Sequence, residues 1–416
     1  MSYQKPKGTQ DILPQEVEKW QYFEQTAREW CRRFNYKEIR VPIFENTDLF
    51  IRGVGETTDV VSKEMYTFED KGKRSMTLRP EGTAGVVRSF VENKLYAEPD
   101  VTKLYYTGPM FRYEQPQAGR YRQFHQFGIE AFGSVDPTID AEAIALGYYI
   151  ITDLGIRDVT IELNSVGNAE SRAAYKEKLK TYLQPMKEGL CKDCQSRFEK
   201  NPMRILDCKI DGDKFHDAPS ILDSLDEACL SHFTAVQDAL MAMDIPFKVN
   251  PNMVRGLDYY TLTAFEYTCE GIGAIHTIGG GGRYNGLVGD IGGPDKPGIG
   301  FGLGMERIML MMDIQEVALP NKNPLDIYFI GLGEQADKEV TRLLYKARNA
   351  GLRVDKDYMQ RKMKAQMKAA DRNQARYAAI LGEDELLQGN IMLKNLSTGE
   401  QEIVPIASLI EHVKRT

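Results

Sequence analysis

Two neighbouring stretches, residues 105–114 and 124–132, are rich in aromatic and other β-prone side chains. The residues between them, 115–122, are mostly polar and include a proline and a glycine. Two β-prone runs that flank such a loop are typical of a β-hairpin. We therefore predict a hairpin here.

The predicted hairpin carries charge on strands that would otherwise be apolar. Since side chains alternate across a strand, Arg112 and Glu114 are expected to share one face of the first arm. One face of the second arm is expected to carry Phe124, Gln126, Gly128 and Glu130. Buried charges are costly unless they are paired or bound. A polar binding site and a solvated face with cross-strand ion pairs both fit this pattern.

Helical spacing and alternation predict the elements around the hairpin. The apolar stripe of a helix over 15–34 consists of Val17, Trp20, Phe23, Ala27 and Trp30. Strands are predicted at 36–44, 65–68, 75–78 and 159–164, and helices at 83–94, 138–154, 168–188 and 218–243. Pro42 demotes the first strand to an edge, a bend or an interface. After a linker at 320–324, strands and helices alternate for about 90 residues, which predicts a separate α/β domain.

Charge is unevenly distributed along the chain. The 416 residues carry a net charge of −7, with 42% hydrophobic and 27% charged residues. Residues 338–376 hold 12 Lys and Arg against 4 Asp and Glu, a local +8 that leaves −15 for the rest. This segment suits the docking of a polyanion, and equally two helices with solvated basic faces.

Without an 18-residue apolar run or an apolar N-terminal segment, we expect a cytoplasmic protein with no membrane span.

Six cysteines in a chain of this length do not make a disulfide framework. Cys191, Cys194 and Cys208 form a CxxC followed by one more cysteine. Three thiolates could hold zinc with a fourth ligand such as His216, but the second closely spaced pair of ligands is missing. This favours reduced structural thiols and no tightly bound metal.

Two other stretches contain groups that could bind a ligand. Arg79 and Glu81 precede a helix that Thr83 is expected to cap. A helix N-terminus beside a carboxylate can hold a zwitterion. The glycines of residues 300–304 alternate, which strips one face of a strand of side chains. A flat ligand can lie on such a face beneath the planar guanidinium of Arg307.

These stretches resemble the motifs of one family. FRYE (Phe111–Glu114) and GIGFGLGMER (Gly298–Arg307) resemble motifs 2 and 3 of class II aminoacyl-tRNA synthetases. VRGLDYY (Val254–Tyr260) and GGGRYNGL (Gly280–Leu287) resemble the two signature stretches of histidyl-tRNA synthetases of the bacterial type. LRPEGT and RYRQFHQFGIE match that family as well. The resemblance covers essentially the whole chain, with the motifs in order.

The resemblance implies an α+β fold with a class II antiparallel β-sheet, flanked by helices and centred on the hairpin. It implies a catalytic domain over 1–320 with a helical insertion at about 168–243, and a C-terminal α/β anticodon-binding domain over 325–416. The implied enzyme, a histidine–tRNA ligase, activates L-histidine with ATP to histidyl-adenylate and pyrophosphate. It then transfers histidine to the 3′ end of tRNA-His. A homodimer with the Pro42 region at its interface is also implied.

For ATP, the resemblance assigns Arg112, Glu114, Phe124 and Arg307. Arg112 and Arg255 would carry the catalysis by contacting the α-phosphate from two sides. Adenine would stack on Phe124 beneath Arg307, and Glu114 would touch adenine or orient Arg112. Mg²⁺ would accompany the β- and γ-phosphates.

For histidine, the resemblance implies a polar pocket. Its matched residues are Glu81, Thr83 and Gln126 on the ammonium side, Glu130 and Tyr260 on the imidazole side, and Arg255 at the carboxylate. Arg112 and Tyr259 are also counted among the histidine-binding residues. A carboxylate and a phenol suit the two distinct nitrogens of imidazole. Such a pocket rejects apolar amino acids, because its polar atoms would be left unpaired. The 115–122 loop departs from its relatives, which often carry more basic residues than Arg120 and Arg122.

Three other interpretations stay open at this point. A synthetase-like regulatory subunit of histidine biosynthesis binds without ligating, but it typically lacks the C-terminal domain and the key arginines that this chain keeps. A class II enzyme for threonine or proline would need a different pocket. A nucleic-acid-binding protein without catalysis would explain the basic segment and leave the hairpin arginines without a purpose.

Overall fold

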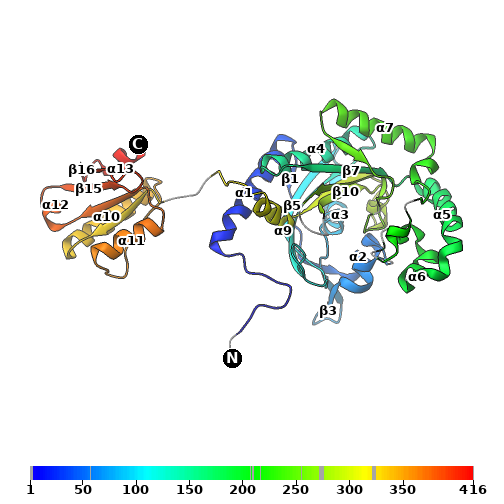
Figure 1. Ribbon diagram of the computed structural model, residues 1–416, viewed down its shortest axis with the longest axis horizontal. Helices are drawn as coiled ribbons and strands as arrows, with labels where there is room; N and C mark the ends of the chain where they lie inside the picture. The colour runs from blue at the N-terminus through cyan, green and yellow to red at the C-terminus, as the bar shows by residue number, and fades with distance from the viewer. Residues whose placement is uncertain are drawn as a thin grey trace. The chain divides into compact units, whose positions relative to one another are not determined.

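The computed structural model describes most of the chain. The described residues are 3–56, 58–206, 208, 210–215, 217–253, 255–270, 276–320 and 325–415. His216, Val254 and linker residues 321–324 lie outside them. The chain divides into two compact units, Met1–Ala318 and Leu319–Thr416 (Figure 1). Each unit has its own hydrophobic core.

An eight-stranded sheet forms the centre of the first unit (Figure 1). Its strands, in spatial order, are β1 (Lys37–Glu38), β5 (Thr102–Phe111), β6 (Gln123–Phe132), β11 (Gly298–Gly304), β10 (Thr277–Arg283), β9 (Thr261–Cys269), β7 (Val159–Ser165) and β8 (Phe247–Val249). The six inner strands are antiparallel. The edge strands β1 and β8 pair in parallel, so the sheet predicted to be antiparallel is mixed.

The predicted hairpin is formed by β5 and β6, which pair along their whole length. Strand β5 ends at Phe111, so the prediction that Arg112 and Glu114 share a strand face is wrong. The physical reason is that the backbone leaves the ladder here. The Tyr113 N–H donates to the carbonyl of Glu64 at 2.7 Å instead of to β6.

The two faces of the sheet differ in chemistry. The apolar face packs against α1 (Pro14–Arg33), α4 (Pro137–Asp153) and α9 (Met305–Ile314). On this face the ring of Phe127 lies 5.9 Å from that of Phe23 in α1. The opposite face carries the predicted set of β6 side chains, beside the glycines of β10 and β11. Because glycines leave that face bare, a ligand can approach its backbone.

Smaller elements surround the sheet. A three-stranded sheet has the order β2 (Phe44–Asn46), β4 (Ser75–Leu78) and β3 (Tyr66–Glu69). The other helices of the unit are α2 (Thr47–Val54), α3 (Thr83–Glu92), α5 (Ala169–Leu183), α6 (Lys192–Lys200), α7 (Glu227–Ala242) and α8 (Leu287–Asp290). Short helical turns lie at Val60–Glu64, Leu95–Ala97, Gln184–Gly189, Pro202–Ile205, Gly212–Lys214 and Ile221–Ser224. Pro42 falls between β1 and β2, so the strand predicted over 36–44 is split in two.

The second unit is a three-layer α/β structure. Its sheet has the order β13 (Val354–Lys356), β12 (Ile327–Gly331), β14 (Tyr377–Leu381), β15 (Asn390–Asn395) and β16 (Gln401–Pro405). Its helices are α10 (Glu334–Asn349), α11 (Met363–Arg372), α12 (Glu383–Leu387) and α13 (Leu409–Arg415). Alternate strand residues separate two cores: Phe329 packs with α10, whereas Tyr328 packs with α11. Across the described parts of both units, no helix combines the length and apolarity that a membrane crossing needs.

Candidate active site

A cavity of about 440 Å³ lies on the glycine-rich face of the large sheet. The predicted site residues that line it are Glu81, Thr83, Arg112, Glu114, Phe124, Gln126, Arg255, Tyr259, Tyr260 and Arg307. Glu130 does not line it, and lies buried next to the lining residue Gly300. The structure therefore brings residues of the hairpin together with residues far away in the sequence.

Glu81 lies at the start of α3 and takes the capping role that was predicted for Thr83. Thr83 is the first helical residue and not the cap. The Glu81 carboxylate accepts the N–H groups of Thr83 at 2.6 Å and of Ala84 at 2.8 Å. Burial raises the pKa of Glu81, although these two hydrogen bonds favour the ionised form and oppose the shift. The carboxylate is thus fixed at the cavity wall, with lone pairs left for another donor.

Glu130 is 1% exposed and is held by two tyrosines. Its carboxylate accepts hydrogen bonds from the hydroxyls of Tyr106, at 3.2 Å, and Tyr284. Burial raises the pKa of Glu130 to about 8, although these hydrogen bonds oppose the shift. Sequence reasoning missed both tyrosines, because an aromatic residue in or beside a strand is expected to be core.

The glycines under the cavity, including Gly128 and Gly300, are required by close packing as well as leaving the sheet face open to a ligand. A Cβ on Gly300 would overlap the Glu130 carboxylate and the carbonyl of Ile129. A Cβ on Gly128 would overlap the ring of Tyr106, whose hydroxyl reaches Glu130. The glycines thus make room for the buried acid and its tyrosine partner.

Arg112 and Arg255 reach the cavity from different elements. The Nε of Arg112 donates to the carbonyl of Pro80 at 2.8 Å, and its guanidinium lies 5.4 Å from the ring centre of Phe124. Arg255 forms an ion pair with Glu266, which sequence reasoning missed. The buried Nε of Arg255 has no hydrogen-bond partner among the described residues. An unsatisfied buried donor is costly, so an anionic ligand beside it is favoured.

Two more arginines, Arg307 and Arg120, line the cavity. Nη1 of Arg307 donates to the carbonyl of Thr277 at 2.6 Å, and burial lowers the pKa of Arg307. Arg120 folds back from the hairpin loop to Glu114, with 2.6 Å between Nε and the carboxylate. Glu114 therefore pairs with Arg120 more closely than with Arg112, which lies 3.9 Å away.

The second basic side chain of the hairpin loop, Arg122, is also held by neighbouring groups. The guanidinium of Arg122 lies 3.8 Å from the ring centre of Tyr113 and donates to the carbonyl of Glu114 at 3.2 Å. Its backbone N–H donates to the carbonyl of Gly8 at 2.8 Å. The N-terminal segment thus packs on this loop, which the sequence did not indicate.

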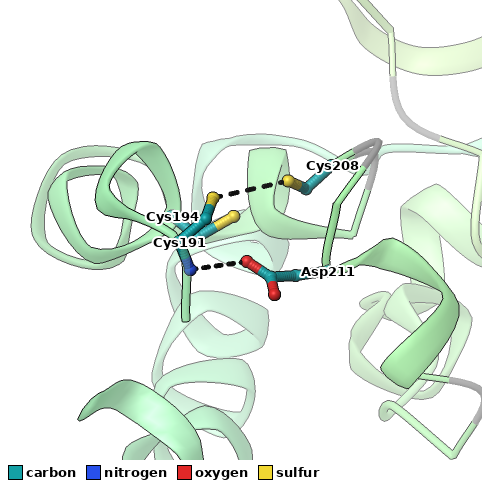
Figure 2. Close-up of side chains that lie close together, drawn as sticks. All are labelled: Cys191, Cys194, Cys208 and Asp211. Atoms are coloured by element: carbon teal, nitrogen blue, oxygen red, sulfur yellow. Dashed lines mark hydrogen bonds between the residues drawn. The ribbon is translucent and has the colours of Figure 1, made fainter. Parts of the chain in front are cut away.

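The three cysteines of the CxxC stretch also come together, away from the cavity lining. Cys191, Cys194 and Cys208 gather around Asp211 (Figure 2). The sequence provided the cysteines but not the aspartate, because no fixed spacing links a lone Asp to a CxxC.

Comparison with known proteins identifies the family. Residues 8–308 match the family model of histidyl-tRNA synthetase, and residues 326–416 match that of an anticodon binding domain. The chain belongs to the histidyl-tRNA synthetase family. It is 57% identical, over 419 aligned positions, to the histidine–tRNA ligase of Anoxybacillus flavithermus, with 100% of this chain and 99% of that protein covered.

Other members of the family are similar over their full length. The histidine–tRNA ligase of Bacillus cytotoxicus is 56% identical, covering 98% of this chain and 97% of that protein. The crystal structure of the apo S. aureus histidyl-tRNA synthetase has a TM-score of 0.86 and 44% identity, covering 99% and 100% of the two chains. The predictions of this family, of a class II α+β fold with a C-terminal α/β domain, and of a histidine–tRNA ligase are therefore confirmed.

Proposed function

We propose that the cavity binds L-histidine and ATP side by side and forms histidyl-adenylate, before histidine passes to tRNA-His. The observation that carries this proposal is the meeting of Arg112, Arg255 and the buried acid Glu130 on one bare-glycine sheet face. The arginines suit a charged phosphate, and the acid suits a polar amino acid.

Histidine occupies the end of the cavity near Glu130. Glu81, Thr83 and Gln126 receive its ammonium group, and the fixed Glu81 carboxylate supports this role. Glu130 reaches one imidazole nitrogen across the bare position of Gly300, and Tyr260 faces the other nitrogen. Tyr259 packs between Tyr260 and Tyr284. The raised pKa of Glu130 lets it keep a proton near neutral pH and donate to an unprotonated imidazole nitrogen.

The reaction is an in-line displacement at the α-phosphate. The histidine carboxylate oxygen forms a bond to phosphorus while the bond to the pyrophosphate oxygen breaks. Arg112 and Arg255 stabilise the charge that develops on the phosphoryl oxygens, since planar guanidinium groups bind such oxygens bidentately. Both side chains are already anchored, through Pro80 and Glu266.

Adenine stacks on Phe124 and is covered by Arg307, which the carbonyl of Thr277 holds in place. Glu114 orients Arg120, with which it pairs closely, and the more distant Arg112. Mg²⁺ bound to ATP would neutralise charge on the β- and γ-phosphates, and those phosphates would supply most of its ligands. The carboxylates of Glu114 and Glu266, which pair with Arg120 and Arg255, are the oxygen ligands that the cavity could add.

The second unit is proposed to bind the anticodon of tRNA-His. The basic segment 338–376 spans α10 and α11 of that unit, which supports contact with a polyanion.

For the first unit, we propose domain limits of 1–320 with an insertion at about 168–243. We also propose a cytoplasmic homodimer. The exposed Ile43, Phe44 and Phe68 beside Pro42 support an interface there.

The proposal is tested by histidine-dependent ATP–pyrophosphate exchange in the variant Glu130→Ala. An unpaired buried imidazole nitrogen costs about 1–3 kcal/mol, so we expect kcat/KM for histidine to fall by roughly 10- to 100-fold or more. KM for ATP should stay near the wild-type value. A matched control is Glu142→Ala, because Glu142 pairs with Lys103 of the same hairpin outside the cavity. Undiminished exchange in folded Glu130→Ala would show that the pocket is misassigned.

A further inference from the structure

Three thiols and one carboxylate meet in the helical segment that follows β7. Cys191 directly precedes α6, Cys194 lies in its first turn, and Cys208 and Asp211 follow from the next loop. The three Sγ atoms and a carboxylate oxygen of Asp211 lie within 4.8 Å of one another (Figure 2). Asp211 is only 1% exposed and Cys194 is fully buried. The cysteines also belong to the hydrophobic cluster of this segment, so packing accounts for their burial. Packing does not account for the buried Asp211 carboxylate among the three thiols.

We propose that Cys191, Cys194, Cys208 and Asp211 form a structural zinc site. Tetrahedral zinc with Zn–S bonds of about 2.3 Å places its sulfur ligands about 3.8 Å apart. The Sγ atoms of Cys191 and Cys208 are 3.8 Å apart. A disulfide would instead bring these atoms to about 2.05 Å. The proposal revises the sequence-based expectation of reduced thiols without metal.

The ligand chemistry selects zinc over the hard divalent cations. Thiolates bind soft or borderline metals, whereas Mg²⁺ and Ca²⁺ prefer oxygen ligands. With Zn²⁺ bound, three thiolates and one carboxylate give the site a net charge of −2. The ammonium group of Lys214, whose Nζ lies 2.6 Å from a carboxylate oxygen of Asp211, partly offsets this charge. The Asp211 carboxylate also accepts the Cys191 N–H at 2.8 Å, which fixes its orientation (Figure 2). A ligand held in this way by the chain itself is typical of metal sites.

The site would fasten the segment that supports the active-site loop. The metal closes the chain between Cys194 and Cys208, and two side chains of that closed stretch contact the loop before β9. Arg204 donates to the carbonyl of Gly256 at 2.6 Å. Asn201 donates to the Asp258 carboxylate at 3.3 Å. That loop begins at Arg255 and ends at Tyr260, so zinc is assigned a positioning role and not a catalytic one.

Zinc content of the purified full-length protein tests the proposal. After growth with added zinc and dialysis in reducing buffer, we expect one zinc per chain by elemental mass spectrometry. Cys191→Ser, Cys194→Ser and Cys208→Ser should lose it. The matched control Cys229→Ser should keep it, because Cys229 is also a buried thiol but lies outside the cluster. Asp211→Asn removes a charged ligand, so it should weaken zinc binding by at least the roughly 10- to 100-fold that loss of a partner behind a ligand costs.

A second measurement covers cysteine variants that fail to fold. Wild-type protein stripped with a chelator is titrated with Co²⁺, which gives strong thiolate-to-cobalt absorption and tetrahedral visible bands in such a site. Zinc should restore the melting temperature of the stripped protein, since it binds the folded state. Reduced wild-type protein that carries no zinc and gives no thiolate–cobalt absorption overturns the proposal. Loss of the metal in Cys229→Ser overturns it as well.

Discussion

The cavity and the cysteine cluster are both polar sites in the first unit, but they differ in how far the protein itself supplies partners for their polar side chains. In the cavity, the chain itself supplies partners: Arg255 pairs with Glu266, and Glu130 binds two tyrosine hydroxyls. In the cluster, three thiols surround Asp211, and Lys214 contacts only the carboxylate. Charges that are paired in advance allow substrates to enter and leave. Three thiols beside a carboxylate suit the one resident cation proposed above.

The two buried acids show this difference in their protonation. Lys214, together with the Cys191 N–H, holds the pKa of Asp211 well below its ordinary value. Burial instead raises the pKa of Glu130 from 4.5 to about 8. Glu130, beside the cavity, is therefore mostly protonated near pH 7, whereas Asp211, in the cysteine cluster, is ionised.

The largest expected effect that tests this contrast is on pH-dependent stability. The folded state keeps the Glu130 proton that the unfolded chain releases above pH 4.5. Stability from this proton is complete below pH 4.5 and is lost as the pH rises to about 8. The slope is at most about 1.4 kcal/mol per pH unit. Glu130→Gln has no such proton, so its free energy of unfolding should fall less over this range. Parallel curves from denaturant unfolding of the two proteins would contradict the contrast.

A smaller effect is expected from Gly300→Ala, which tests the steric origin of the cavity. The added Cβ would overlap the Glu130 carboxylate and the backbone of Ile129. Overpacking of this kind costs about 1–3 kcal/mol of unfolding free energy, measured by urea denaturation. Gly289→Ala is the control, because no neighbouring heavy atom lies within 4 Å of its added Cβ. Equal stability of the two variants would show that the glycine floor is not tightly packed.

Much of the cavity could be predicted because its residues lie in short, ordered motifs. Alternation alone placed Gln126 and Glu130 on one face of β6, and the structure agrees. Alternation failed for Arg112 and Glu114, because β5 ends at Phe111, before both residues. Where a strand ends depends on distant backbone partners, which local pattern does not contain.

Partners that are distant in sequence were not predictable. Tyr106 and Tyr284 resemble ordinary core residues until the fold brings their hydroxyls to one acid. Asp211 is one of many acidic residues until a loop brings it to the cysteines. Glu81 was recognised as part of a site, but its role at the start of α3 depends on the actual first residue of that helix.

The central claim is that the glycine-floored cavity selects histidine for activation. The most direct measurement is ATP–pyrophosphate exchange by the full-length protein with each of the standard amino acids in turn. We predict exchange with histidine and background rates with all the others. Comparable exchange with another amino acid, or none with histidine in folded protein, would contradict the claim.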